Sequence, residues 1–437
     1  MRTTSPQTHG LITLCLLAIG AGAGTGFVGG TFRWCLERAG DGSVDLVHWA
    51  HRFGVAGVLI PVVTTAVCAV LAGRIVRWVP LAAGSGIQHV EAVNDGDADA
   101  APLILLPAKF LGGLLAIGSG LVLGREGPTV HMGAVIGAEA GRRARRSEQD
   151  VRLLQTSVGG AGLAVAFNAP IGGALFVLEE VTKSFTIRTV LPTALGVATA
   201  VGCSRLILGD QPDFAVPSMA APSLALLPLF IVFGLLTGLL GAAYNRTVIG
   251  FLALIKIFEA IPMTVKTAGV GAAVGVALFV QPLTVGGGDR LTQEILGRAS
   301  FAVPALVFYF VVRFLMGPLS YSAGTPGGLF APLLALGALW GGLFASVSGW
   351  VLPIGHLAAP MAIVGMASFF AATVRAPLTG IVLVIEMTAI TSVTVPMLAA
   401  TGCAVLAAAL VRSAPIYDTL RAQMLAGMAP SKEGPKD

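Results

Sequence analysis

The chain has 437 residues, of which 55% are hydrophobic and only 11% charged, and its mean hydropathy is +0.85. A water-soluble globular domain of this size does not tolerate so apolar a composition, so we expect a polytopic membrane protein. The net charge of +5 comes from basic residues clustered in loops, which is typical of cytoplasmic loops. No interleaved basic and aromatic stretch indicates a nucleic-acid surface. The five cysteines show no paired spacing, so we expect no disulfide, metal or cofactor site.

Apolar runs recur along almost the whole chain. They lie at residues 11–30, 53–73, 103–123, 157–178, 189–208, 222–243, 267–281, 302–316, 328–347, 361–372, 376–390 and 393–411. Several are shorter than the roughly 20 residues that cross a bilayer. Short segments interrupted by glycine and proline are typical of broken or re-entrant helices that line a polar cavity. The sequence therefore predicts an all-α membrane protein with partly re-entrant helices.

The first glycine-rich element is Gly84-Ser85-Gly86-Ile87, which opens an apolar stretch and offers a hydroxyl donor. Taken alone, such an element is more often a turn. Further along, Lys109 lies just inside an apolar run, where a charge needs a partner such as Glu91. We interpret Lys109 as structural.

The next element, Gly124-Arg125-Glu126-Gly127-Pro128, carries two charges within apolar sequence. Proline suits the first turn of a helix, whose free amides and dipole form an anion site. A carboxylate at Glu126 would compete with an anion for those amides, and protonation would remove its charge. We therefore interpret Glu126 as a gate and proton acceptor. The alternative is a structural ion pair with Arg125.

Two glutamates, Glu179 and Glu180, end an apolar run that begins at Ala169. From these residues alone, a local cap or ion pair at a cytoplasmic boundary is favoured over a function.

The chain then repeats itself. Gly328-Leu329-Phe330-Ala331-Pro332 matches the pattern at 124–128 with an offset of 204, and Ala376-Pro377 with Glu386 matches Ala169-Pro170 with Glu179 at an offset of 207. We interpret this as two transmembrane halves, 1–215 and 216–420, joined through a polar loop near residues 211–222. Close packing through small residues is the alternative explanation. In transporters, ligands bind where discontinuous helices of two such halves meet, so the two glycine motifs should face one another.

The end of the chain carries three further features. Glu386 is interpreted as structural, with Arg375 as its partner, and Tyr417 follows the last apolar run. A tyrosine there is more often an interface anchor. Residues 421–437 are predicted to be a short polar cytoplasmic tail without a regulatory domain.

Together, the elements at 84–87, 124–128 and 327–332 and the late Tyr417 resemble the CLC chloride channel and transporter family in order and spacing. The resemblance covers nearly the whole chain. It implies a homodimer in which each subunit has its own anion pathway, built from two inverted halves of tilted and re-entrant helices.

The resemblance also implies roles for particular residues. Ser85 and Tyr417 would give hydroxyls to the central anion, and the amides of Leu329 and Phe330 would complete its shell. Glu126 matches the external gating glutamate. Glu180 matches the internal proton glutamate of the family's exchangers, which its channels generally lack.

The chain departs from the family at Gln88 and His89, where proline and glutamate usually follow the serine element. Histidine puts a titratable group near the inner mouth, which leaves the proton route there open. Ser85 favours chloride, because nitrate-preferring relatives carry proline there and the fluoride-exporting branch replaces the serine.

We therefore expect a chloride/proton antiporter in a bacterial inner membrane, with chloride, protons, the bilayer and a second copy of the chain as partners. The nearest alternative is a passive voltage- or pH-gated chloride channel of the same fold, and a fluoride exporter is opposed by Ser85. An intramembrane enzyme is opposed because Gly-x-Ser-x-Gly and His-Glu-x-x-His are absent and the six histidines lack ligand spacing.

Overall fold

The computed structural model describes residues 6–297, 301–352 and 357–428, which form seventeen α-helices. Apart from two isolated bridges, these residues contain no β-structure, which confirms the all-α prediction. The first eight helices are α1 (Pro6–His51), α2 (Leu59–Trp78), α3 (Ile87–Asp95), α4 (Leu105–Gly118), α5 (Glu126–Arg143), α6 (Glu148–Phe167), α7 (Pro170–Phe176) and α8 (Ile187–Leu208). The other nine are α9 (Leu227–Ile257), α10 (Met263–Val280), α11 (Asp289–Leu296), α12 (Val303–Ser322), α13 (Phe330–Ser348), α14 (Ala358–Val374), α15 (Pro377–Thr388), α16 (Thr394–Leu410) and α17 (Ile416–Met428).

Within the described ranges, seven helices are long and apolar enough to cross a membrane: α1, α2, α8, α9, α10, α12 and α13. Four more, α4, α14, α15 and α16, are apolar but shorter, as the interrupted runs predict. Large apolar side chains such as Leu16, Trp78 and Val280 are exposed, as expected for surfaces that face lipid. The chain is a multi-pass membrane protein.

The helices repeat as well as the motifs. Helices α1 to α8 and α9 to α16 follow each other in the same order, each set opening with its longest helix and continuing to a short third helix. The pairing is also repeated, since α5 packs on α6 as α13 packs on α14, and α1 on α8 as α9 on α16. Equivalent helices contact each other directly, α2 with α10 and α7 with α15. Such self-pairing is what a two-fold relation between the halves produces.

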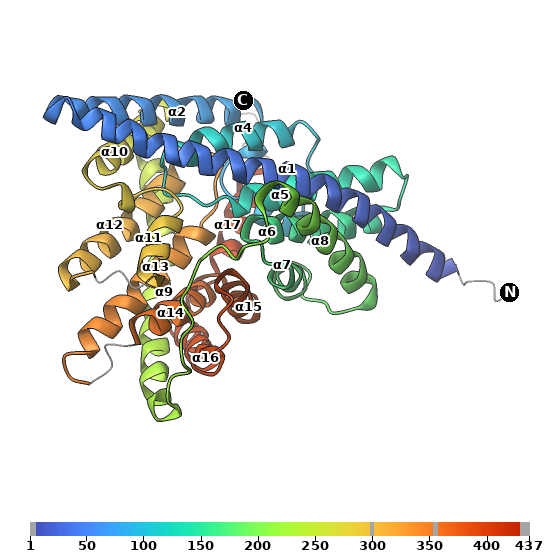
Figure 1. Ribbon diagram of the computed structural model, residues 1–437. Helices are drawn as coiled ribbons and strands as arrows, with labels where there is room; N and C mark the ends of the chain where they lie inside the picture. Colours follow the sequence, from blue (N-terminus) through green and yellow to red (C-terminus); the bar gives the residue numbers. More distant parts are fainter. Residues whose placement is uncertain (1–5, 298–300, 353–356, 429–437) are drawn as a thin grey trace, which may run out of the picture.

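Figure 1 shows how the halves are arranged. The teal-to-green helices α5 to α8 lie on one side of the yellow-to-red helices α10 to α16, while α1 and α2 run along the edge that joins them. Helix α13 is the most enclosed of the membrane-length helices, with 72% of its most apolar window buried against 28–39% in the others. The helix that follows the second glycine motif therefore lies at the centre of the molecule.

Glycines allow α13 and α14 to approach closely. A Cβ atom on Gly341 would lie 2.1 Å from the carbonyl oxygen of Met361, and one on Gly365 would lie 2.2 Å from that of Gly337. The same contact recurs in the first half, where a Cβ on Gly137 would lie 2.4 Å from the carbonyl oxygen of Leu154. The glycines that mark the sequence repeat thus serve the same packing in both halves.

The corners before α7 and α15 also correspond. Asn168 follows the last residue of α6 and Arg375 follows the last residue of α14, and both caps are in the left-handed conformation, with φ of 48° and 76°. Pro170 and Pro377 then occupy the first turn of the next helix, where a missing N–H is tolerated.

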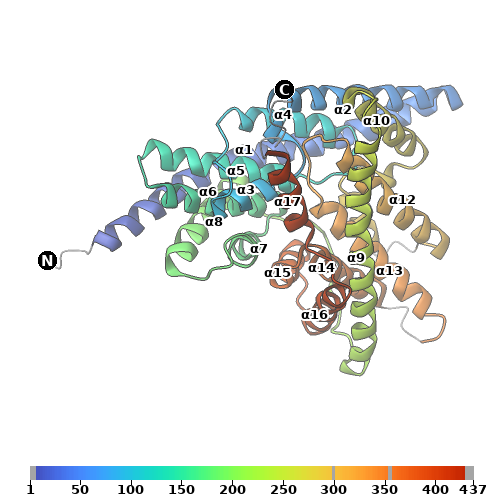
Figure 2. The ribbon, with the colours of Figure 1, turned by 180° about the vertical axis from the view of Figure 1, so that it is seen from behind.

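The predicted tail is partly helical. Residues 421–428 continue α17, and Arg421 pairs with Asp95 at the end of α3. Figure 2 shows α17 beside α3, between the two halves. Residues 429–437 of the predicted tail lie outside the described part of the chain.

Candidate functional site

The three glycine-rich loops meet. Gly124 and Gly328 exchange two backbone hydrogen bonds, each amide donating to the other residue's carbonyl at 2.7 Å. Gly84 joins them, because its amide donates to the carbonyl of Thr325 at 3.1 Å and its own carbonyl accepts from Gly327 at 3.0 Å. The prediction that the two repeated motifs face one another is confirmed.

Three helices begin at this junction. Helix α3 begins at Ile87, α5 at Glu126 and α13 at Phe330, and none of their N-cap residues provides a side-chain cap. The first-turn amides of such helices lack partners within the helix and carry the positive end of its dipole. Backbone donors from both halves therefore converge on one buried region, which suits an anion.

The polar side chains at this junction are buried and unsatisfied by protein. Ser85, Glu126 and Tyr417 each have 0% of their surface exposed. Among the described residues, the hydroxyl oxygens of Ser85 and Tyr417 and both carboxylate oxygens of Glu126 find no hydrogen-bond partner. Buried polar atoms are nearly always satisfied, so a cluster of unpaired ones points to a ligand that they share.

Contacts tie these residues to the helix starts. A Cβ on Gly127 would lie 2.2 Å from the Ser85 hydroxyl, so the serine packs directly on the first turn of α5. The Tyr417 ring lies edge-on to the Phe330 ring, with centroids 5.5 Å apart. Leu329 and Phe330 are both fully buried. The structure thus brings the predicted anion-binding residues and Glu126 into one neighbourhood.

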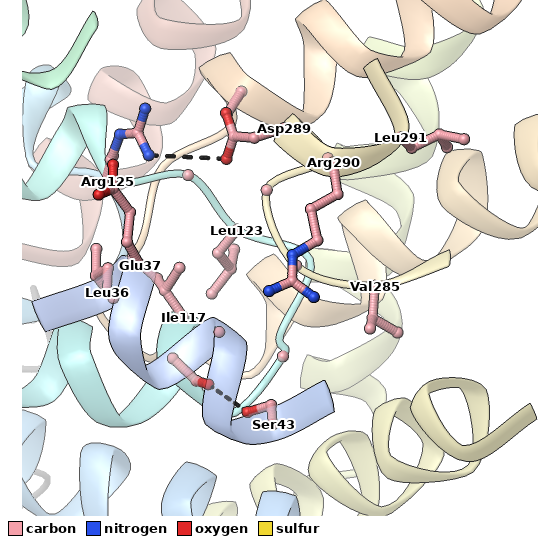
Figure 3. Close-up of a pocket in the computed structure, with 18 of the residues that line it drawn as sticks. Leu36, Glu37, Ser43, Ile117, Leu123, Arg125, Val285, Asp289, Arg290 and Leu291 are labelled. Carbon is pink, nitrogen blue, oxygen red and sulfur yellow. Dashed lines mark hydrogen bonds and ion pairs between the residues drawn. The ribbon is translucent and has the colours of Figure 1, made fainter. Parts of the chain in front are cut away.

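A cavity of about 260 Å³ opens beside Glu126, and several charged side chains stand among its largely apolar lining residues. Figure 3 shows Arg125 and Asp289 facing each other, and Arg125 Nη1 lies 3.8 Å from Asp289 Oδ2. Arg290 lines the cavity on the side of Asp289. Arg290 in turn pairs with Asp41 of α1. This cavity gives Glu126 a polar neighbourhood on one side of the junction.

Arg125 does not serve as the partner of Glu126. Its guanidinium binds Asp213 at 3.2 Å, and its Nε donates to the carbonyl of Ala166 at 2.9 Å. Asp213 also pairs with Arg33 at 2.6 Å and is only 3% exposed. The loop predicted to be a polar connection therefore carries a buried carboxylate, and the alternative of a Glu126–Arg125 ion pair is wrong.

Comparison with known proteins identifies the family. Residues 67–409 match the family described as voltage gated chloride channel. The chain is 38% identical over 353 residues to the H(+)/Cl(-) exchange transporter ClcA of Vibrio cholerae serotype O1, covering 79% of this chain and 75% of that protein. The Vibrio vulnificus protein of the same name is 39% identical over 355 residues with the same coverage. This chain belongs to the voltage-gated chloride channel (CLC) family.

A solved structure supports the assignment. The crystal structure of a slow cyanobacterial Cl⁻/H⁺ antiporter superimposes on this CLC protein with a TM-score of 0.89 and 28% identity, covering 97% of this chain and 99% of that one. The resemblance inferred from the glycine motifs is confirmed. With it, a CLC fold is confirmed in which some helices are long enough to cross the membrane and others are shorter.

The second glutamate of interest in this CLC protein lies at the far end of α3. Glu180 is 7% exposed, on a single π-helical turn formed by Val177–Val181. Asn94, near the end of α3, donates to the carbonyl of Val181 at 3.2 Å. Since α3 has nine residues and is roughly 14 Å long at 1.5 Å per residue, it separates Ser85 from the region of Glu180.

Glu179 has a different partner from its neighbour. Its carboxylate accepts from the amides of Leu378 and Thr379 at 3.0 and 2.7 Å, and from the Thr379 hydroxyl at 2.7 Å. It therefore caps α15, in the other half of the CLC fold, while Glu180 remains free of this contact.

Two predicted partners are wrong. Lys109 is fully buried, but its ammonium donates to the carbonyls of Ala82, Ala83 and Gly84 at 3.0, 3.4 and 2.8 Å rather than to Glu91. Glu386 accepts from the amides of Ile171 and Gly172 at 3.0 and 2.7 Å, while Arg375 binds the carbonyl of Ser413. In both cases main-chain groups take the place of the expected charged side chain. Every residue has such groups, so the sequence does not show which of them will be the partner.

Two buried groups near the site were not expected to belong to it. Glu91 is 4% exposed, and neither of its carboxylate oxygens has a hydrogen-bond partner within the described ranges. His131, five residues after Glu126, is 1% exposed and contacts His89. A lone histidine within an apolar helix gives no signal until its neighbour from another helix is known.

Proposed function

We propose that this protein exchanges chloride for protons across a bacterial inner membrane. The observation that carries the proposal is Glu126, a buried carboxylate without a partner at a helix start, in a site whose other donors are neutral. The names of the ClcA relatives and of the cyanobacterial structure support the same activity. As in those transporters, no covalent chemistry is proposed, so the protein is not expected to be an enzyme.

The anion is held by the hydroxyls of Ser85 and Tyr417 and by the amides of Leu329 and Phe330. These partial charges replace part of the hydration shell of chloride and still release it, which a fixed cation would hinder. Ionised Glu126 competes with chloride for the amides of the helix start. Protonated Glu126 loses that advantage, leaves the pathway and admits chloride, and on losing its proton it returns and displaces chloride, so proton binding to Glu126 is linked to chloride binding.

Glu180 takes the proton to the cytoplasmic side by a route partly separate from that of chloride. Its distance from Ser85 along α3 and its burial support this role. The short α17 tail is then cytoplasmic, and the two halves are related by an inverted topology, as in other transporters with discontinuous helices at the midplane.

We also propose that the protein is a homodimer with one pathway per subunit. The exposed apolar side chains Ile171 of α7 and Leu378 of α15 lie at the paired helix starts and support a shared face. The protein part of the particle mass in detergent, after the bound detergent is subtracted, should be twice the 44.4 kDa of one chain, and a protein mass of one chain would contradict this.

Replacement of Glu180 by Gln tests the exchange mechanism. In reconstituted vesicles, Glu180→Gln should abolish chloride-driven proton movement and leave chloride flux, because glutamine has no carboxyl proton to relay but keeps the shape. The control is Glu148→Gln, whose side chain is 92% exposed. Proton coupling that survives in Glu180→Gln would remove Glu180 from the mechanism, and a wild type that never moves protons would favour the passive channel.

A further inference from the structure

A pair of histidines packs against the loop Gly84-Ser85-Gly86-Ile87, which we call the serine loop. His131 of α5 and His89 of α3 are 1% and 4% exposed, and the His131 Nε2 and His89 Nδ1 atoms are 3.2 Å apart. The ring centroids are 5.1 Å apart. The proposed exchange cycle uses neither ring, although His89 is one of the two residues at which the sequence departs from its family.

The surroundings of the pair fix the direction of its hydrogen bond. His131 Nδ1 is buried and has no partner among the described residues. A neutral imidazole carries one N–H, and a buried N–H without an acceptor is costly, so the proton belongs on Nε2. His131 therefore donates and His89 Nδ1 accepts.

The pair is expected to stay neutral. The charged side chain that acts on both rings is Lys109 of α4, and the main chain of Asp99 also faces His89. Lys109 is fully buried and bound only by carbonyls. Protonation of either ring would place a second positive charge beside the ammonium in a region that excludes water.

The serine loop is held between two helices. A Cβ on Gly86 would lie 2.1 Å from His131 Nδ1, so the imidazole occupies the space beside this glycine, whose φ is +94°. One helical turn earlier on α5, Gly127 packs on the Ser85 hydroxyl. On the other side, Lys109 binds the carbonyl of Gly84 at 2.8 Å. The serine loop is therefore held by the His131 ring and Gly127 of α5 on one side and by Lys109 of α4 on the other.

We propose that His131, held in place by His89, is a positioning residue that fixes the 84–86 turn and thereby determines how tightly and how selectively the site binds chloride. The inference rests on the proposed function, because it concerns the anion site of that function. A hydroxyl held in one place suits an anion of one size and shape, whereas a loosened turn adapts to chloride and to planar nitrate alike.

The direction of the hydrogen bond gives a stereochemical test. The amide nitrogen of glutamine can replace Nε2, so His131→Gln should bind chloride as the wild type does. His131→Asn is too short and His131→Ala has no donor, so both should bind chloride roughly fivefold more weakly, the effect of about one buried hydrogen bond. Both should also lose chloride preference over nitrate. The measurement is calorimetric titration of the purified protein with each anion.

At His89, the expected ranking of the glutamine and asparagine variants by chloride affinity is the reverse of that at His131. His89 accepts through Nδ1, which the side-chain oxygen of asparagine can replace, so His89→Asn should keep chloride affinity and His89→Gln should lose it. If His131→Ala does not yield monodisperse protein, the contrast between glutamine and asparagine at both positions decides. Equal affinities for the two amides at both positions would overturn the positioning role.

The wild type separates this inference from the proposed function. A wild type that exchanges chloride for protons while the amide variants show no contrast rejects the positioning role alone. A wild type that binds neither anion rejects both.

Discussion

Glu126 combines two properties that rarely occur together, complete burial and a carboxylate without a partner. In the proposed mechanism, the helix start stabilises its ionised form, and its protonated form leaves those amides to chloride. We expect Glu126→Gln to mimic the protonated state permanently. Chloride flux should continue, lose its dependence on pH and move no protons, as measured in vesicles at acidic and neutral pH. A variant whose chloride flux keeps the wild-type pH dependence would show that another group is the gate.

The place of a single residue in the site was predictable where the side chain and the backbone donors near it belong to the same loop. Glu126 and Ser85 lie in glycine motifs whose local chemistry points to an anion, and the structure brings both to one junction. The partners of Lys109 and Glu386 were not predictable, because carbonyls and amides from distant segments replace the expected charges. Charge pairing in sequence cannot reveal such backbone partners.

At the scale of elements, two carboxylates lock equivalent helices to each other. Glu179 caps α15, and Glu386 caps α7 in the same way. Glu179→Gln and Glu386→Gln should each lower stability by about 1 kcal/mol, since a neutral amide loses the charge that favours a helix N-terminus. The thermal unfolding midpoint in detergent should fall for both variants, and the control is Glu259→Gln, an exposed residue in the turn after α9 and outside the first turn of any helix. Midpoints equal to that of the control would show that the caps are dispensable.

The helices coincide with the apolar runs except where a charged side chain has a partner within the protein or where the chain turns a corner inside a run. Helix α1 continues from the run at 11–30 to His51, because its charges find partners, such as Arg33 with Asp213 and Asp41 with Arg290. The run at 157–178 instead contains the end of α6 and all of α7, divided at Asn168 in the left-handed conformation. Hydrophobicity alone shows neither a satisfied charge nor a corner.

For the whole molecule, the repeat of glycine motifs was enough to predict that two halves meet at one site. The reciprocal bonds between Gly124 and Gly328 confirm this meeting, and the caps of Glu179 and Glu386 repeat the same reciprocity elsewhere. The cross-half caps themselves were not predictable, because an offset in sequence does not say which ends approach. We propose that coupled transport arises because the two halves share one anion site and only one of them carries a protonatable gate.

The reversal potential of reconstituted protein under opposed chloride and proton gradients tests this account most directly. If Glu126 links the two ions, the reversal potential should lie away from the chloride equilibrium potential and shift when the proton gradient alone is changed. A reversal potential that follows chloride alone, whatever the proton gradient, would contradict coupled exchange and identify a passive chloride pathway.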